Sequence, residues 1–157
     1  MVRIVAVNDD PAEFVLLEKA LTQVSVPHLL ENFHTAESAL SYLRLQSESP
    51  TFHYPQLIIL NLDLSDRSGF ALLHDLKADA DLQPIPVIII STSSNRSDVR
   101  AAYDLHASCY IVKRLNAEAH VTALLSMINF WMLTAQFLPE KAFGLGKAVP
   151  SFHHKAH

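Results

Sequence analysis

The sequence predicts an α/β domain in which helices cover both faces of a parallel sheet. Four short apolar runs, residues 4–7, 56–60, 86–90 and 109–112, end abruptly in polar residues. Segments with the helical spacing of apolar residues separate these runs. Buried strands that alternate with helices imply right-handed crossovers, and these bring the carboxyl ends of all the strands to one edge of the sheet. We therefore expect a site at that edge.

The first half of the chain predicts two strands, each followed by a helix. After the strand at residues 4–7, residues 11–25 carry apolar residues at steps of three and four, and Pro11 suits the first turn of a helix. Residues 28–33 are predicted to form a short strand. Thr35 is predicted to cap the next helix, and the polar residues 46–54 are predicted to form the loop that leads to the third strand.

The second half of the chain continues the alternation. Gly69 precedes a predicted third helix, and Ser97 is predicted to cap a fourth helix that runs to about Leu105. The last helix is predicted from Asn116 to Leu138. Five strands and five helices in this length suit the flavodoxin-like, doubly wound strand order 2-1-3-4-5, with an extended last helix.

Composition restricts the class of protein. The chain has 157 residues, 50% of them hydrophobic, and a formal net charge of −4, so we expect one domain over residues 1–139, a flexible tail over residues 140–157, and no nucleic-acid partner. The single cysteine, Cys109, is expected to be a reduced thiol, which favours a cytoplasmic protein. No apolar stretch approaches the roughly 20 residues of a membrane span, so no membrane association is expected.

Polar residues at the strand ends predict the contents of the site. In the order 2-1-3-4-5 the first and third strands are neighbours, which places Asn8, Asp9 and Asn61 together. Further polar groups follow the third, fourth and fifth strands, at Asp63, at Ser91 and Thr92, and at Lys113. Acids, hydroxyls and a lysine are typical of a pocket that binds a phosphoryl group and magnesium, but two amides here remove part of its negative charge.

These residues, in this order, resemble the receiver domains of two-component response regulators over roughly residues 2–139. The resemblance implies that Asn8 and Asp9 stand at the metal-binding acidic pair, and that Asn61 stands at the phosphorylated aspartate. It also implies that the backbone carbonyl of Asp63 completes the metal site. The remaining positions that it assigns are the switch hydroxyl Ser91, the switch aromatic Tyr110 and the phosphoryl-contacting Lys113.

Two finer features resemble a subfamily, the single-domain regulators that partner bacterial phytochromes and are best known in cyanobacteria. Lys113 is followed by Arg114, Leu115 and Asn116 rather than by the usual proline. The last helix ends in an aromatic-rich segment. This resemblance implies that the partner is a cytosolic histidine kinase of the phytochrome type, and that the chain forms a homodimer through the face of the last helix.

The end of the last helix is also apolar over more than one face, which predicts a surface for a dimer or another partner. The residues predicted for that surface are Phe130, Trp131, Phe137 and Leu138. The alternative is that this helix packs on its own sheet or beneath the tail.

The amide at position 61 departs from the family in a way that changes the expected chemistry. Phosphotransfer needs a carboxylate oxygen as nucleophile, and an amide is a poor substitute. Magnesium prefers anionic oxygens, and Asp9 is the only certain carboxylate among the expected ligands, so the site for Mg²⁺ at Asn8, Asp9, Asn61 and Asp63 is expected to be weakened or absent. Lys113 is expected to hydrogen-bond Asn61 directly.

Several interpretations remain open. We expect a phosphorylation-deficient receiver, not an enzyme, that signals by docking to other proteins. Alternatively, Asn61 is an engineered block in a Mg²⁺-dependent response regulator that otherwise accepts phosphate, or Asp63 or Asp10 replaces the lost acid. Asp9 could instead cap the first helix, and Tyr110 could be a plain core aromatic. An enzyme on the same fold is the least favoured interpretation, since no nucleophile–base pair can be assembled.

Overall fold

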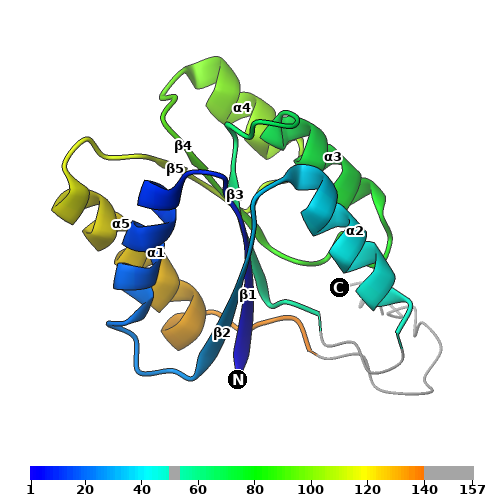
Figure 1. Ribbon diagram of the computed structural model, residues 1–157, viewed down its shortest axis with the longest axis horizontal. Coiled ribbons are helices and arrows are strands. Elements are labelled where there is room, and N and C mark those ends of the chain that lie inside the picture. Colours follow the sequence, from blue (N-terminus) through cyan, green and yellow to red (C-terminus); the bar gives the residue numbers. More distant parts are fainter. Residues whose placement is uncertain (50–53, 140–157) are drawn as a thin grey trace, which may run out of the picture.

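The computed structural model describes residues 1–49 and 54–139, which form a five-stranded, fully parallel sheet (Figure 1). The strand order is β2-β1-β3-β4-β5, as predicted. The strands are β1 (Val2–Val7), β2 (His28–Phe33), β3 (Leu57–Asn61), β4 (Val87–Ser91) and β5 (Cys109–Val112). Every residue of β3 and β4 is buried, as expected of central strands covered on both faces.

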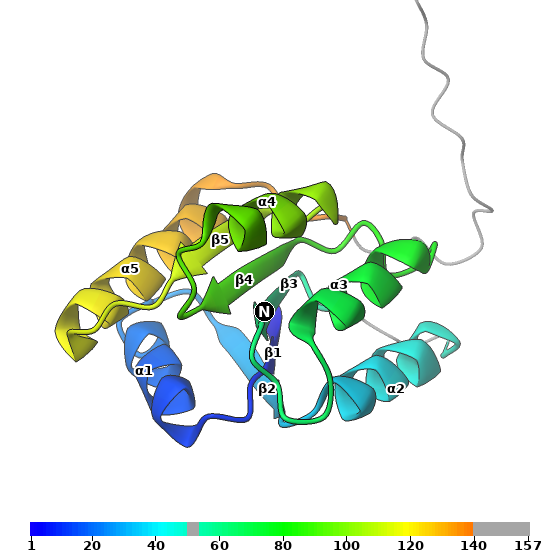
Figure 2. The same ribbon diagram turned by 90° about the horizontal axis from the view of Figure 1, so that it is seen from above.

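Helices cover both faces of this sheet (Figure 2). One face carries α1 (Pro11–Leu21) and α5 (Ala117–Asn129), which enclose a core with strand residues such as Ile4 and Ile59. The other face carries α2 (Ala36–Ser47), α3 (Gly69–Ala78) and α4 (Arg96–Asp104) over a second core. The predicted α/β class is therefore confirmed.

Helix caps agree with the sequence at some positions and not at others. Thr35 Oγ1 accepts from the backbone N–H of Ser38 at 3.1 Å, as predicted. The predicted cap at Ser97 is wrong, because α4 begins at Arg96 and Asn95 is its cap residue. The carbonyl of Asn95 accepts from the N–H of Val99 at 3.1 Å, which puts Ser97 inside the first turn.

Two helices are shorter than predicted. Helix α1 ends at Leu21 rather than residue 25, where Thr22 Oγ1 donates to the carbonyl of Lys19 at 2.8 Å and the chain turns. Helix α5 ends at Asn129 and continues as a single π-helical turn, η1 (Phe130–Thr134), after which Ala135 is extended. The predicted end at Leu138 is therefore wrong. The spacing of apolar residues in the sequence does not indicate this change from α-helix to π-helix.

Strand register places the polar strand ends side by side. Val7 pairs with Leu60, so Asn8 follows one strand beside Asn61 at the end of the next. Asn61 pairs with Ile90, and Ser91 pairs with Val112, so Ser91 and Lys113 continue the same edge. The predicted tail at residues 140–157 lies outside the described residues. Within the described ranges, no helix is long and apolar enough to cross a membrane.

Candidate functional site

The centre of the strand-end site is a pair of buried amides. Asn8 and Asn61 are 5% and 4% exposed, and Asn61 Nδ2 donates to Asn8 Oδ1 at 3.3 Å. Asn8 Oδ1 also accepts from the backbone N–H of Asp10 at 2.9 Å, and Asn61 Oδ1 accepts from that of Asp63 at 3.2 Å. Because each carbonyl oxygen receives a backbone N–H, the orientation of both amides is fixed, and only an N–H of Asn61 can face Asn8.

That amide hydrogen has a definite electrostatic consequence. Two carboxylates at positions 8 and 61 would turn acceptor oxygens toward each other at this distance and repel, unless a cation lay between them. The Asn61 N–H supplies the positive end of a dipole at that point and joins the two residues without an ion.

The acids around the pair accept hydrogen bonds from backbone N–H groups and from a hydroxyl. Asp9 Oδ2 accepts from the N–H of Ser65 at 2.8 Å and so holds the β3–α3 loop against the β1–α1 loop. Asp10, not Asp9, caps α1 and accepts from the N–H of Ala12 at 3.0 Å, so the capping alternative for Asp9 is wrong. Asp63 is exposed, and its Oδ2 accepts from Thr92 Oγ1 at 3.4 Å.

Lys113 lies opposite the carboxylate of Glu13, which was not among the site residues predicted from the sequence. Its Nζ is 4.0 Å from Glu13 Oε2, and the two side chains are only 14% and 6% exposed. Among the hydrogen bonds of residues 1–49 and 54–139 there is none between Lys113 and Asn61, so the expected contact is corrected to one with Glu13. Glu13 carries a full negative charge whereas Asn61 Oδ1 is a neutral amide oxygen, which explains the preference.

Glu13 is also bound by a buried histidine. His120 is 1% exposed, and its Nε2 lies 2.7 Å from Glu13 Oε1. Its Nδ1 accepts from the backbone N–H of Arg114 at 3.4 Å, which leaves the hydrogen on Nε2 to be donated to Glu13. A proline at position 114 would have no N–H for this bond, so the unusual sequence after Lys113 is matched by His120.

A signal for both missed residues exists in the sequence. Glu13 occupies the same helix face as Leu17, Ala20 and Leu21, and His120 precedes Leu124 by one turn on the buried face of α5. A charged or titratable residue on an apolar stripe needs a buried partner. Here the partners come from opposite ends of the chain.

The hydroxyl side of the site joins β4 to β5. Ser91 is 1% exposed, and its Oγ accepts from the backbone N–H of Ser93 at 3.0 Å. Tyr110 is half-buried and donates to the carbonyl of Ser93 at 2.8 Å, while Ser93 Oγ donates to Asp98 Oδ2 at 2.5 Å. The hydroxyl of Tyr110 therefore ties β5 to the β4–α4 loop.

The amide pair borders a small cavity of about 10 Å³, lined by Asn8, Asn61, Glu13 and apolar residues of α1, β1, β3 and β4. This is the volume of about one water molecule, and the polar side chains could satisfy one. Across residues 1–49 and 54–139, this site included, no group of three or more His, Cys, Asp or Glu side chains could hold a metal ion.

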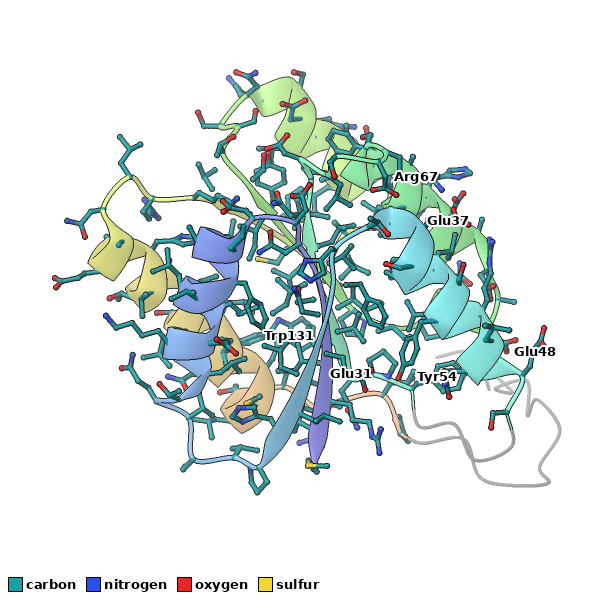
Figure 3. All side chains as sticks on the ribbon, in the orientation of Figure 1. Glu31, Glu37, Glu48, Tyr54, Arg67 and Trp131 are labelled. Carbon is teal, nitrogen blue, oxygen red and sulfur yellow. The ribbon has the colours of Figure 1, made fainter. Side chains whose placement is uncertain are left out.

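The predicted partner surface is partly exposed. Phe130 and Leu138 are 53% and 43% exposed, and Leu133 beside them is 65% exposed. Trp131 (Figure 3) is half-buried against the core under α1 and α5. Its ring centroid lies 5.5 Å from that of Phe130 and 6.3 Å from that of Phe137. Trp131 therefore connects the core to an apolar surface formed by its neighbours.

Comparisons with known proteins agree with this geometry. The family model described as the response regulator receiver domain matches residues 4–125. The response regulator Rcp1 of Synechocystis sp. is 32% identical over 131 residues, which are 83% of this chain and 89% of Rcp1.

Two solved structures extend the match. The phosphorylated cyanobacterial phytochrome response regulator RcpA has a TM-score of 0.80 and 34% identity, over 87% of this chain and 97% of RcpA. The Mn²⁺-bound form of Rcp1 has a TM-score of 0.82 and 30% identity, over 88% of this chain and 100% of that one.

Proposed function

Because the chain belongs to the response regulator receiver domain family and is related to phytochrome-associated regulators, we propose that it is a phosphorylation-deficient signalling protein. It takes part in a phytochrome-type two-component system of the cytoplasm and acts by docking to other proteins. Receiver domains of this kind are signalling proteins rather than classical enzymes, and this chain contributes no catalytic residue.

The observation that carries the proposal is the Asn61 amide at the acceptor position. An acyl phosphate forms when a carboxylate oxygen attacks phosphorus, and the amide offers no comparable nucleophile. Its nitrogen donates to Asn8 and its oxygen accepts from Asp63, so both atoms already take part in a hydrogen bond. Asp10 and Asp63 do not replace it in this proposal, because Asp10 caps α1 and Asp63 is exposed beside Thr92.

We infer that the donor set does not fit a divalent cation as it stands. Mn²⁺ is bound by the relative Rcp1, and Mg²⁺ and Mn²⁺ both prefer anionic oxygens. Here Asn8 Oδ1 already accepts two hydrogen bonds, from the N–H of Asp10 and from Asn61 Nδ2. Asp9 Oδ2 accepts one from the backbone N–H of Ser65. A cation that bound Asn8 Oδ1 would have to displace a donor from it, and would gain only one full negative charge, that of Asp9, between positions 8, 9 and 61.

The partners that we propose are a histidine kinase and a second copy of the chain. The relation to phytochrome response regulators supports a phytochrome-type kinase as the first. The exposed side chains Phe130, Leu133 and Leu138 support the second, because exposed apolar area at a domain surface favours association. A double variant, Phe130→Ser with Leu133→Ser, should convert a dimer to a monomer in light scattering without a loss of helix content. A monomeric wild-type chain at micromolar concentration would contradict the dimer.

The test of the main proposal is labelling by acetyl phosphate and Mg²⁺, followed by intact-protein mass spectrometry. Wild type should show no added phosphoryl group. Asn61→Asp and the double variant Asn8→Asp with Asn61→Asp should be compared with it in the same experiment. An alkali-labile phosphoryl adduct on wild type would refute the proposal.

A second candidate function is a competent, Mg²⁺-dependent phosphoacceptor in which Asn61 is an engineered block. The retained side chains of Asp9, Ser91 and Lys113 favour it, because they are the rest of the family's phosphoryl pocket. Under this alternative, Asn61→Asp alone restores labelling. Under our proposal that single change fails, because Asn8 also lacks a carboxylate.

A further inference from the structure

The proposed function does not account for the buried carboxylate of Glu13. Its side chain is 6% exposed and lies on the inner face of α1. Burial of a carboxylate is costly unless a charge and hydrogen bonds compensate for it. Glu13 must therefore be explained by its partners.

Those partners supply one hydrogen bond and one charge. His120 donates Nε2–H at 2.7 Å and, because its Nδ1 accepts from Arg114, it carries no charge. Lys113 Nζ, at 4.0 Å, is then the cation paired with Glu13 among the ion pairs of the described residues.

Lys113, in turn, needs a negatively charged partner. Its side chain is 14% exposed, and its backbone N–H is fixed to the carbonyl of Ser91 at 2.7 Å. The two residues at the centre of the pocket, Asn8 and Asn61, are uncharged. A largely buried ammonium needs an anion, and Glu13 provides it from the side of α1.

We propose that Glu13 is a positioning residue that balances the charge of Lys113 in place of a carboxylate at position 61, and so withholds the ammonium from any phosphoryl group. His120 fixes the Glu13 carboxylate and, through Arg114, the loop that carries Lys113. This deepens the proposed function and rests on its uncharged position 61. The pocket is then complete without metal or phosphate, which suits a protein recognised in a single state.

The first test is a double-mutant cycle in thermal unfolding. Glu13→Gln keeps an acceptor for His120 but removes the charge, and Lys113→Met keeps the length of the side chain. Each single variant should lower Tm, and the double variant should lose at least about 3 °C less than the sum. Glu18→Gln, an exposed change on the same helix, is the matched control and should be additive with Lys113→Met. Additive losses for Glu13 and Lys113 would overturn the proposal.

The second test separates positioning from plain stabilisation. In the background Asn8→Asp with Asn61→Asp, labelling by acetyl phosphate and Mg²⁺ is measured with and without Glu13→Gln. Release of Lys113 should raise the labelling rate at least about fivefold although Tm falls, whereas a merely structural acid would leave the rate equal or lower it. An equal or lower rate overturns the proposal. If neither background accepts phosphate, the unfolding cycle decides alone.

The two proposals fail separately. Labelling of the wild-type chain would refute phosphorylation deficiency and leave the Glu13–Lys113 cycle intact. Additivity in the cycle would refute the role of Glu13 and leave the wild-type result intact.

Discussion

The substitution Asn61→Asp should destabilise this protein, although it restores the residue typical of the family. It removes the hydrogen bond from Asn61 Nδ2 to Asn8 Oδ1, worth about 1 kcal/mol. It also turns a carboxylate oxygen toward an acceptor 3.3 Å away, at a site only 4% exposed. An uncompensated buried acceptor costs about 1–3 kcal/mol. Lys113 offsets little of this, because it already faces Glu13.

The expected total is a loss of about 2–4 kcal/mol, or roughly 5–12 °C in Tm for a chain of this size. The assay is thermal unfolding followed by far-UV circular dichroism at neutral pH, with a chelator present. Asn95→Asp is the matched control, since Asn95 is exposed and makes no side-chain capping bond. It should change stability by less than about 0.5 kcal/mol.

The loss of stability in Asn61→Asp should depend on pH in a definite direction. The introduced carboxylate should bind a proton more readily in the folded state than in the unfolded one, because burial and the oxygen of Asn8 oppose its charge. The deficit is then full at neutral pH, shrinks as pH falls through the folded-state pKa, and vanishes below the unfolded value of about 3.9. A neutral-pH loss no larger than that of Asn95→Asp would refute the reasoning.

Three further perturbations have definite outcomes. Gly69→Ala should cost about 3 kcal/mol in urea unfolding, because its Cβ would lie 2.6 Å from Leu62 Cα and 2.7 Å from Asn61 O, both backbone atoms; a loss below 1 kcal/mol would contradict this. Burial would raise the pKa of Asp66, but backbone N–H groups, including those that begin α2, outweigh it and hold that pKa below its ordinary value. Asp66→Asn should therefore lower Tm at neutral pH, with the difference fading as pH falls below about 3.9; a gap that persists in acid would be inconsistent. Burial raises the pKa of the Cys109 thiol, so at pH 8 its reaction with a disulfide reagent should be about tenfold slower in the folded than in the unfolded chain, and equal rates would count against it.

The sequence was sufficient for the sheet and for the neighbours at its edge. Apolar runs with abrupt polar ends are strong signals, and in parallel strands they also fix which residues meet. The proximity of Asn8 and Asn61 follows from that order and is found at 3.3 Å. Local geometry was less accessible: Pro11 at the start of α1 places the cap at Asp10, one residue later than the alternative considered for Asp9.

The charge pairing inside the pocket could not be read from spacing. Glu13 and His120 are 107 residues apart, and their contact depends on how α1 and α5 pack against each other. Lys113 was expected to face Asn61 because position 61 was considered alone. An ammonium interacts more strongly with a carboxylate than with an amide oxygen. The position of the buried Glu13 on α1 therefore determines where the Lys113 side chain lies.

The most direct measurement is a magnesium titration of the wild-type chain, followed through the side-chain amide resonances of Asn8 and Asn61. The two side-chain amides are hydrogen-bonded to each other, so any cation bound between positions 8, 9 and 61 must shift their resonances. We predict no saturable shift up to millimolar magnesium, whereas the variant Asn8→Asp with Asn61→Asp should show saturable shifts at the N–H groups of Asp63 and Ser65. A saturable shift of the wild-type amides would contradict the account, because it would show that the amide pair still accepts the metal.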